Sequence, residues 1–447
     1  MHMSRFRDPD IFLQIGATRD GLDPYLREAR RRSMTAVLIE TPAYLRLRRR
    51  LDRQPFDLEL GIDDPGCPEA VRAALTDRAD RVRLVLGGFE RYNACAHAAA
   101  LALGIPLARD ARRRPFLPLD KAAQRAVLAE CAPEVAQPGH ITIALDQVRG
   151  QGHDLAAMIE LAQLRYPLVV KPSDGGSGLG VVLVDAPPAL AAAIGQLCAM
   201  TNSGDGAFSR VVVEELIEGT ELSIQAVAFD GAATILTVCD KLIVREHTTA
   251  GGGLSGFREA AHIARPGTAA DAPLRALAQR CIDAMGYSNG PFHIDAIRNA
   301  RGLYFVEMGF RLSCGGIVGL VERTTGTRWG ELVFAIHLDH RGPAPVPGLP
   351  APDRAVGLVT LTTDAELMFF RELVAGDDKI EVRLISGSTP DDAGDDADPE
   401  LASDRLRHGG CKARVFLEAN DPATIRRRFK QGLHARLAPG AWLAGRD

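Results

Sequence analysis

The 447-residue sequence lacks several features that would assign a protein to a class at once. None of its eight cysteines forms a C-x-x-C or C-x-x-x-C pair, so the usual ligand spacing of a zinc or dithiol site is missing. The charged start MHMSRFRDPD precedes only a short apolar stretch, and no apolar run is long enough to cross a membrane. We therefore expect reduced thiols, a cytoplasmic location and no membrane partner.

A strong charge of either sign is also missing. Lys and Arg total 53 against 57 Asp and Glu, a net charge of -4, so the chain has no general attraction for nucleic acid and we expect no such partner. Hydrophobic residues make up 46% and charged residues 25%, which excludes a wholly disordered chain. At roughly 150 residues per domain, the length predicts about three domains that act on small molecules.

Three glycine motifs are absent although glycine is abundant, with 44 residues. The sequence has no G-x-x-x-x-G-K-[ST], no G-x-G-x-x-G that opens a helix and no G-x-S-x-G. P-loop, dinucleotide-binding and nucleophile-elbow sites are therefore excluded on their residues.

The order of apolar runs and turns predicts an α/β protein with an N-terminal parallel sheet. Strand IFLQIGA, a helix over 24–32 and strand TAVLIE form one βαβ unit, and strand RVRLVLGG precedes an Ala-rich helix. We predict an N-terminal domain over 1–118, a central region over 119–341, a Pro-rich linker over 342–352 and a C-terminal α/β domain over 353–447. The acidic run 386–404 is expected to be a loop in that last domain.

The strongest chemical signal is the segment 166–184, in which two apolar strands flank a glycine-rich turn. Lys171 ends the first strand, and Ser173 and Ser177 lie among the glycines of 175–180. Glycines let backbone N–H groups approach an anion, and a lysine adds a point charge for phosphate oxygens. A plain hairpin turn needs fewer glycines, so we predict a lid over phosphates.

A second segment, 210–229, contains two alternating strands around a short polar link. Such a link can offer backbone groups to a planar base and acidic side chains to an exocyclic amine or to ribose hydroxyls. An ordinary charged strand edge is the open alternative.

The third segment, 290–311, predicts two strands around the turn Asn299–Gly302. Asp295 and Glu307 are equidistant from Arg301, so a hairpin centred there makes the two carboxylates cross-strand partners. Because like charges placed opposite one another destabilise a sheet, the pair predicts a divalent cation, Mg²⁺ or Mn²⁺. Two exposed acids are the alternative. His293 shares the Asp295 face, Gly309 and Arg311 share the Glu307 face, and a packed histidine is the simpler role for His293.

These three segments in this order, preceded by Leu119-Asp120-Lys121, resemble the ATP-grasp carboxylate–amine ligases over about residues 120–340. The resemblance implies an ATP-grasp fold, α+β in its central part, with a lid subdomain over about 130–213 and with ATP and Mg²⁺ or Mn²⁺ as cofactors. It also implies metal ligation by Asp295 and Glu307 and makes Arg311 and Lys171 the catalytic residues, with Arg311 on the substrate carboxylate. The implied ATP-binding residues are Lys121, Lys171, Ser173, Gly175, Gly176, Ser177, Gly178, Glu214, Glu215, Ile217 and Glu221.

One position departs from that resemblance. Many relatives have an asparagine two residues after the metal-binding glutamate, and Gly309 stands there, which puts a second metal ion in doubt. The segment 245–262 resembles a flap beside the acceptor amine, with a disordered surface loop as the alternative. Candidate substrate contacts are Arg311, His293, Arg258 and His262, with Lys241 and Glu259 as further candidates.

The activity that this resemblance implies is amide formation through an acyl phosphate, with release of ADP and phosphate. The substrates are expected to be a carboxylic acid or amino acid plus an amine, most like the L-amino-acid ligases that form dipeptides. A biotin-carboxylase-like or ribonucleotide-amine ligase of the same fold, or a catalytically silent ATP-binding module, remains as an alternative. A homodimer, common in this superfamily, is left open.

Overall fold

The structure is a computed structural model of the chain. It describes residues 9–18, 23–105, 120–150, 155–175, 178, 180–200, 207–247, 255–265, 271–343, 354–374, 380–384 and 412–433. Several predicted features lie outside the described residues, namely Gly176, Ser177, most of the Pro-rich linker and the acidic loop 386–404.

The N-terminal part is a parallel sheet with strand order β3-β2-β1-β4, as predicted. Strand β2 lies on one side of β1 and β4 on the other, so the carboxyl ends of β1 and β4 border a topological switch point, where open α/β sheets bind ligands. Proline stands at the start of α1, α2 and α3, where its missing N–H costs nothing. The elements are β1 Ile11–Ile15, α1 Pro24–Arg31, β2 Thr35–Glu40, α2 Pro42–Arg50, β3 Leu58–Gly61, α3 Pro68–Leu75, β4 Val82–Gly87 and α4 Asn93–Ala102, with 3-10 turns Thr76–Arg81 and Glu90–Tyr92.

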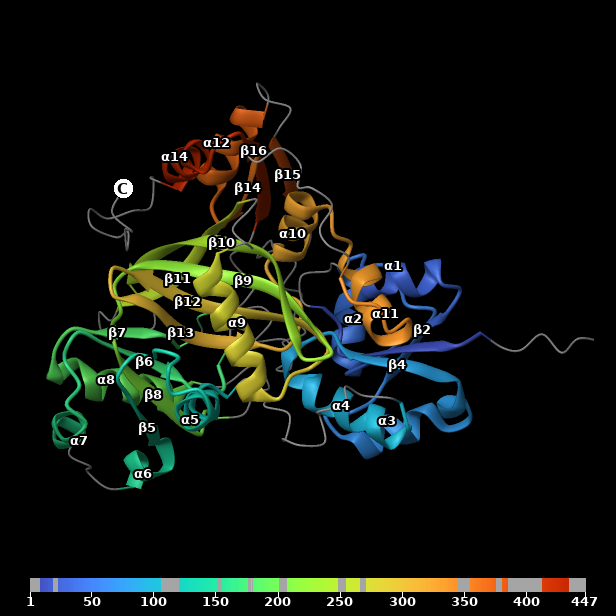
Figure 1. Cartoon of the computed structure of the whole chain (residues 1–447), viewed down its shortest axis with the longest axis horizontal. Helices are drawn as coiled ribbons and strands as arrows, with labels where there is room; N and C mark the ends of the chain where they lie inside the picture. Colours follow the sequence, from blue (N-terminus) through green and yellow to red (C-terminus); the bar gives the residue numbers. More distant parts are fainter. Residues whose placement is uncertain are drawn as a thin grey trace, which may run out of the picture.

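The central region is one large, mainly antiparallel sheet in the described part of the chain, with order β13-β12-β9-β10-β11-β7-β6-β8-β5. Strands β5 to β8 form the lid half and β9 to β13 the core half, and Ser255 of β11 pairs with Leu183 of β7 where the halves meet. Figure 1 shows the lid half and the N-terminal sheet on opposite sides of the core half. The strands are β5 His140–Ala144, β6 Leu168–Pro172, β7 Val182–Val184, β8 Arg210–Glu215, β9 Thr220–Phe229, β10 Ala232–His247, β11 Ser255–Arg265, β12 Gly290–Asn299 and β13 Gly302–Gly309.

Helices cover both halves and connect the core half to the N-terminal sheet. Phe12 of β1, Tyr25 of α1 and Phe334 of α11 share one buried aromatic cluster, so the two parts have a common core. No helix among the described residues is both long and apolar enough to span a bilayer. The helices are α5 Lys121–Cys131, α6 Leu145–Gly150, α7 Leu155–Leu161, α8 Pro187–Ala199, α9 Ala272–Met285, α10 Ile317–Thr325 and α11 Trp329–Leu338.

The C-terminal strands join the central sheet. Strand β14 Ala355–Leu361 pairs with β11, and β16 Ala413–Ala419 lies between β14 and β15 Ile380–Leu384. Helices α12 Asp364–Val374 and α14 Pro422–Leu433 pack on these strands. The predicted domain boundaries stay a prediction, because the sheet runs without a break from the core half into the C-terminal strands.

Candidate active site

The β12–β13 hairpin places Asp295 directly opposite Glu307. The predicted pairing of the two carboxylates is present, but the register of the hairpin differs from the one that the sequence suggested. The turn is Asn299–Gly302, as predicted, so pairing near it is offset by one residue from a hairpin centred on Arg301. The register then shifts between Asp295 and Ala296, which leaves Val306 without a partner in the ladder. This bulge restores the opposition of the two carboxylates.

Lysine side chains offset the charge of this carboxylate pair. Lys121 Nζ lies 2.9 Å from Glu307 Oε2, and Lys241 Nζ lies 2.7 Å from Asp295 Oδ2. Asp295 Oδ1 also accepts a hydrogen bond of 2.7 Å from Ser223. The sequence argument that the pair needs a divalent cation was therefore too narrow, because buried ammonium groups can neutralise it as well.

Lys241 lies among three carboxylates that converge from three strands. Its Nζ is 2.9 Å from Glu221, 2.6 Å from Glu259 and 2.7 Å from Asp295. Burial lowers the pKa of Lys241, but these carboxylates outweigh it and hold that pKa well above its ordinary value. Glu221, one of the implied ATP-binding residues, and Glu259 thus lie beside Asp295, and these three carboxylates form the proposed metal side of the site.

The donor set fits a hard divalent cation. One carboxylate oxygen from each of Glu221, Glu259 and Asp295 lies within 4.8 Å of the other two, and oxygen-only ligands suit Mg²⁺ or Mn²⁺. Glu307 Oε2 is buried, and Lys121 Nζ is its ion-pair partner. Burial raises the pKa of Glu307, but the charge and hydrogen bond of Lys121 outweigh burial and lower this pKa to about 2. The carboxylate is therefore ionised at neutral pH.

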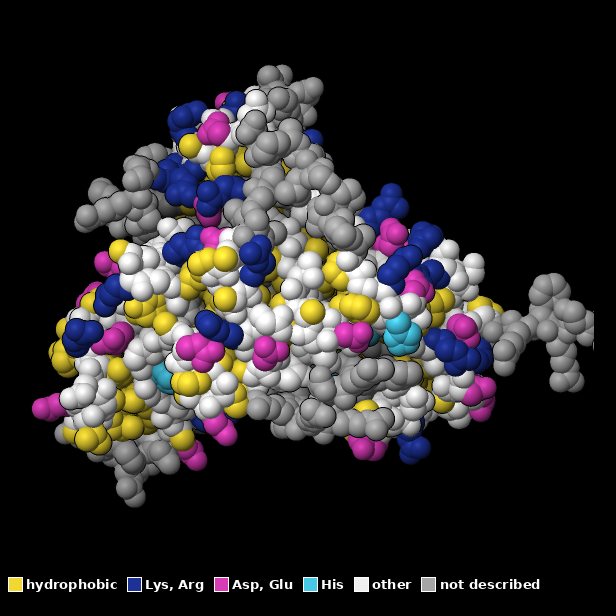
Figure 2. All heavy atoms as spheres, in the orientation of Figure 1, with side chains coloured by type: hydrophobic (Ala, Val, Ile, Leu, Met, Phe, Trp, Pro, Cys, Tyr) yellow, Lys and Arg dark blue, Asp and Glu magenta, His cyan; other side chains and the backbone are white. Residues whose placement is uncertain are grey.

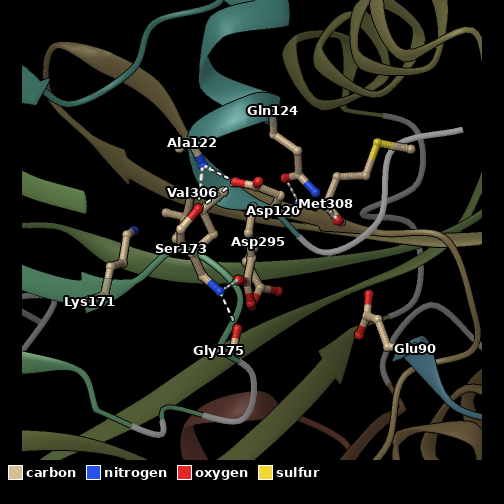
Figure 3. A network of polar contacts seen from close by, with 12 residues as sticks. Glu90, Asp120, Ala122, Gln124, Lys171, Ser173, Gly175, Asp295, Val306 and Met308 are labelled. Carbon is tan, nitrogen blue, oxygen red and sulfur yellow. Dashed lines mark hydrogen bonds and ion pairs between the residues drawn. The ribbon is translucent and has the colours of Figure 1, made fainter. Parts of the chain in front are cut away.

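The start of α5 meets the glycine-rich loop. Asp120 caps the helix by accepting hydrogen bonds from the backbone N–H groups of Ala122 and Ala123, and it also accepts one from the Ser173 hydroxyl. Lys121 donates to the carbonyl of Gly175 through Nζ and to that of Ser173 through its backbone N–H. Figure 3 shows Asp120, Ser173 and Gly175 together, with Lys171 and Glu90 on opposite sides.

Glycine is required in the part of this loop that the structure describes. Gly178 and Gly180 have φ of +74° and +72°, a conformation that side chains with a Cβ rarely adopt. A Cβ on Gly180 would also lie 2.6 Å from Leu197. The loop conformation therefore depends on these glycines.

Lys171 and Arg125 share the carboxylate of Glu214. Lys171 donates to Oε1 and Arg125 to Oε2, each at 2.5 Å, and all three side chains are buried. Burial raises the pKa of Glu214, but Lys171 and Arg125 together hold it below its ordinary value. Sequence reasoning missed Arg125, because no local motif marks a helical arginine that meets a strand 89 residues away.

The predicted base-binding link joins two separate parts of the sheet. Strand β8 lies between β6 and β5, while β9 lies between β12 and β10, so the link 216–219 passes from the lid half to the core half. Ile217 lies in this link, and Glu215 accepts a hydrogen bond of 3.0 Å from the Arg165 side chain.

Arg311 reaches the N-terminal part of the chain. Its Nε donates a hydrogen bond of 2.7 Å to Glu90 Oε2, whereas Glu90 Oε1 is buried without a hydrogen bond. Sequence reasoning missed Glu90, which is 221 residues away from Arg311. Arg311 also lines a small cavity at the carboxyl ends of β1 and β4, together with Thr18, Tyr25, Gly87, Gly88, Ser313 and Cys314.

His293 fills the space above Gly309. The two residues are cross-strand partners, and a Cβ on Gly309 would lie 2.2 Å from the imidazole ring. His293 Nδ1 also lies 3.3 Å from the carbonyl oxygen of Arg311. The departure from the asparagine of related ligases thus has a steric reason in this chain.

The predicted flap begins and ends in paired strands. Residues 245–247 of β10 pair with 255–257 of β11, and the intervening 248–254 and the Arg258 side chain lie outside the described residues. His262 is the cross-strand partner of Lys241, and its Nε2 lies 3.4 Å from Glu259 Oε2. His262 therefore lies beside the carboxylates of the metal side.

The face of the molecule that Figure 2 shows has no large patch of one charge among its described residues. Basic and acidic side chains are interspersed there over the lid half, the core half and the N-terminal part. This agrees with the near balance of charge in the sequence.

Known proteins resemble this chain in sequence and in fold. The ATP-grasp domain family matches residues 164–318. The ATP-grasp enzyme fsqD of Aspergillus fumigatus is 29% identical over 183 residues. That match covers 37% of this chain and only 31% of fsqD.

Solved structures of the same fold cover almost the whole chain. The L-amino acid ligase from Bacillus licheniformis has a TM-score of 0.63 at 18% identity, covering 95% of this chain and 97% of that protein. The carboxyaminoimidazole ribonucleotide synthase from Aspergillus clavatus, complexed with ATP, has a TM-score of 0.64 at 13% identity, covering 96% and 98%. At these identities the similarity shows the fold.

Proposed function

This chain contains an ATP-grasp domain and has the ATP-grasp fold, and from this premise we propose that it is an ADP-forming carboxylate–amine ligase. One observation carries the proposal. Lys121 and the glycine loop after Lys171 meet at the start of α5, beside the opposed carboxylates Asp295 and Glu307. Such a site can hold a nucleotide triphosphate and neutralise its charge.

The proposed reaction has two steps. A carboxylate oxygen of the first substrate attacks the γ-phosphorus of ATP, the bond to the bridging oxygen breaks, and ADP leaves. The amine nitrogen of the second substrate then attacks the acyl carbon, phosphate leaves, and the nitrogen loses a proton. The product is an amide, and no covalent bond to the enzyme forms.

The side chains of this protein position the substrates and neutralise charge. Lys121, Lys171 and the loop amides would contact the phosphate groups, and the lid half would exclude water that hydrolyses the acyl phosphate. Asp295 and Glu307 would hold a divalent cation, with Glu221 and Glu259 near. When bound, Mg²⁺ or Mn²⁺ supplies positive charge to phosphate oxygens.

The contact between Arg311 and Glu90 supports an amino acid as a substrate. A guanidinium from the core half and a carboxylate from the N-terminal part face each other, and the guanidinium lines a small cavity. An amino acid has the complementary charges, so its carboxylate can meet Arg311 and its ammonium can meet the unsatisfied Oε1 of Glu90. Dipeptide formation is the reaction that this pair favours.

The test incubates the full chain with ATP, MgCl₂ and a pool of the twenty amino acids. We expect ADP and phosphate in equal amounts and a dipeptide in the mass spectrum, all dependent on the amino acids. Glu307→Ala is expected to reduce ADP formation at least 100-fold. Arg301→Ala, in the exposed turn of the same hairpin, is the matched control and is expected to keep the wild-type rate.

The alternatives give different results in the same assay. A ligase of the biotin-carboxylase or ribonucleotide-amine type would form ADP with bicarbonate or a phosphorylated sugar amine and would ignore the amino acids. A silent nucleotide-binding module would bind ATP and release neither ADP nor phosphate under any of these conditions.

A further inference from the structure

Arg125 makes contacts that the proposed chemistry does not use. Its side chain is fully buried in α5, and it reaches Glu214 of β8 as well as the backbone carbonyls of Phe305 and Val306 in β13. One turn earlier on the same helix, Lys121 lies 2.9 Å from Glu307. Helix α5 thus touches the phosphate side of the site through Lys121 and the proposed base side through Arg125.

The contact with Glu214 is shared, and this sharing creates an electrostatic problem. Lys171 is the other cation on Glu214, yet the proposed function draws Lys171 toward the nucleotide phosphates. If Lys171 were the only cation, its engagement with phosphate would leave a buried carboxylate partly uncompensated, which is costly. A guanidinium stays charged at any physiological pH, so Arg125 can hold Glu214 throughout.

Arg125 also weakens the hold of Glu214 on Lys171. Burial is the main cause that lowers the pKa of Lys171; Glu214 raises it, and the positive charge of Arg125 lowers it again. Two cations on one carboxylate repel each other. The Lys171 ammonium is therefore stabilised when it moves from the shared carboxylate to a phosphate. The geometry therefore suits a lysine that can be redirected without loss of the carboxylate.

We infer that Arg125 is a positioning residue, which keeps Glu214 ionised and oriented while Lys171 turns to the phosphates of the bound nucleotide. The inference rests on the proposed ATP site. It concerns a residue that touches neither nucleotide nor metal in the proposed chemistry and that acts on Lys171 through Glu214.

The test measures the ATP dissociation constant by calorimetry between pH 7.0 and 8.5. In Arg125→Met, Glu214 loses its last cation when Lys171 moves to the ATP phosphates. The pKa of Glu214 is then higher in the ATP-bound state than in the free state. Binding then takes up a proton, and affinity falls as pH rises through the window between those two values. We expect at least tenfold weaker binding at pH 8.5, with a clear loss from pH 7.0 to 8.5.

The other charged groups near Glu214 do not produce this pH dependence. His140 of β5 is the cross-strand partner of Glu214, and burial lowers its pKa below the ordinary value, so it stays neutral in this range. Any titration of ATP itself is common to wild type and variant. Wild type and Arg125→Lys are therefore expected to show the same shallow pH dependence.

A second background separates positioning from a merely structural role. In Glu214→Gln no carboxylate needs compensation, so adding Arg125→Met is expected to weaken ATP binding less than threefold. Arg165→Met, which removes an exposed partner of the neighbouring Glu215, is the control and is expected to change the constant less than twofold.

Three results would overturn the inference. Arg125→Met could bind ATP as wild type does, it could lose the same factor at every pH, or it could lose more than tenfold in the Glu214→Gln background. The last comparison stands even where the single variant fails to fold. Failure of the wild-type chain to bind ATP would instead contradict the proposed function.

Discussion

At the scale of single residues, Gly309 and His293 form a matched pair. A methyl group on Gly309 would overlap the imidazole ring, so we predict that Gly309→Ala lowers the free energy of unfolding by about 2 kcal/mol. Urea unfolding measures this. Gly195, in α8, has open space around the position of a Cβ, and Gly195→Ala is expected to raise the same quantity by about 0.5–1 kcal/mol.

The overlap also predicts coupling between the two positions. In a His293→Ala background the ring is absent, and Gly309→Ala is expected to cost less than about 0.5 kcal/mol. An equal cost in both backgrounds would mean that the backbone of Gly309, rather than the ring, limits this position.

Lys241 is a second residue whose role can be tested alone. Lys241→Met leaves Glu221, Glu259 and Asp295 without their shared cation, and loss of one partner from a buried ion pair costs about 3–5 kcal/mol. We predict that the melting temperature of this variant falls in EDTA and that Mg²⁺ raises it more than in wild type. Equal Mg²⁺ responses in the two proteins would show that a cation does not enter this group.

At the scale of elements, the cap of α5 connects helix stability to the site. Asp120 accepts two backbone N–H groups, so Asp120→Ala is expected to cost about 1 kcal/mol, while Asp120→Asn retains an acceptor and costs less. Because Lys121 follows the cap, we also expect Asp120→Ala to raise the KM for ATP. A stability loss with an unchanged KM would show that the start of α5 does not position Lys121.

The elements differ in how far the sequence could predict them. Period-two alternation and a turn sequence are local, so they were enough to predict the β12–β13 hairpin, whereas the predicted opposition of Asp295 and Glu307 is reached through a bulge. The bulge at Val306 was not predicted, because one extra residue in a strand leaves little trace in the pattern.

Contacts between distant elements could not be predicted from the sequence, for a different reason. Arg125 and Glu90 reach the site only after α5 packs on β8 and β13 and after the N-terminal sheet docks on the core half. No spacing rule places a helical arginine or a loop glutamate beside a residue that is 89 or 221 positions away.

At the scale of the whole molecule, ion pairs between α1 and α11 reinforce the shared core. Arg32 donates to both oxygens of Asp339 at 2.8 Å and to Glu28. The Arg32 hydrogen bonds lower the pKa of Asp339; for Glu28, burial raises the pKa but Arg31 and Arg32 lower it more. A carboxyl group whose pKa is lowered by folding stabilises the folded state when the pH is above its pKa in the unfolded chain, about 4. This contribution is lost as the pH falls.

We therefore predict a pH-dependent effect of Arg32→Met. The variant should be less stable than wild type by about 1 kcal/mol above pH 5, a modest value because Asp339 is partly exposed to solvent. The difference should shrink as the pH falls from 5 toward 3, as urea unfolding at several pH values would measure. A difference that does not change with pH would assign the effect to the packing of Arg32 on Phe334.

The central claim, amide formation through an acyl phosphate, is tested most directly by isotope transfer. The full chain is incubated with ATP, MgCl₂ and amino acids labelled with ¹⁸O in the carboxylate, and the released phosphate is analysed by mass spectrometry. The account predicts that each phosphate carries one ¹⁸O atom, because the attacking carboxylate oxygen leaves with phosphorus. Phosphate without label, or release of AMP and pyrophosphate, would contradict it.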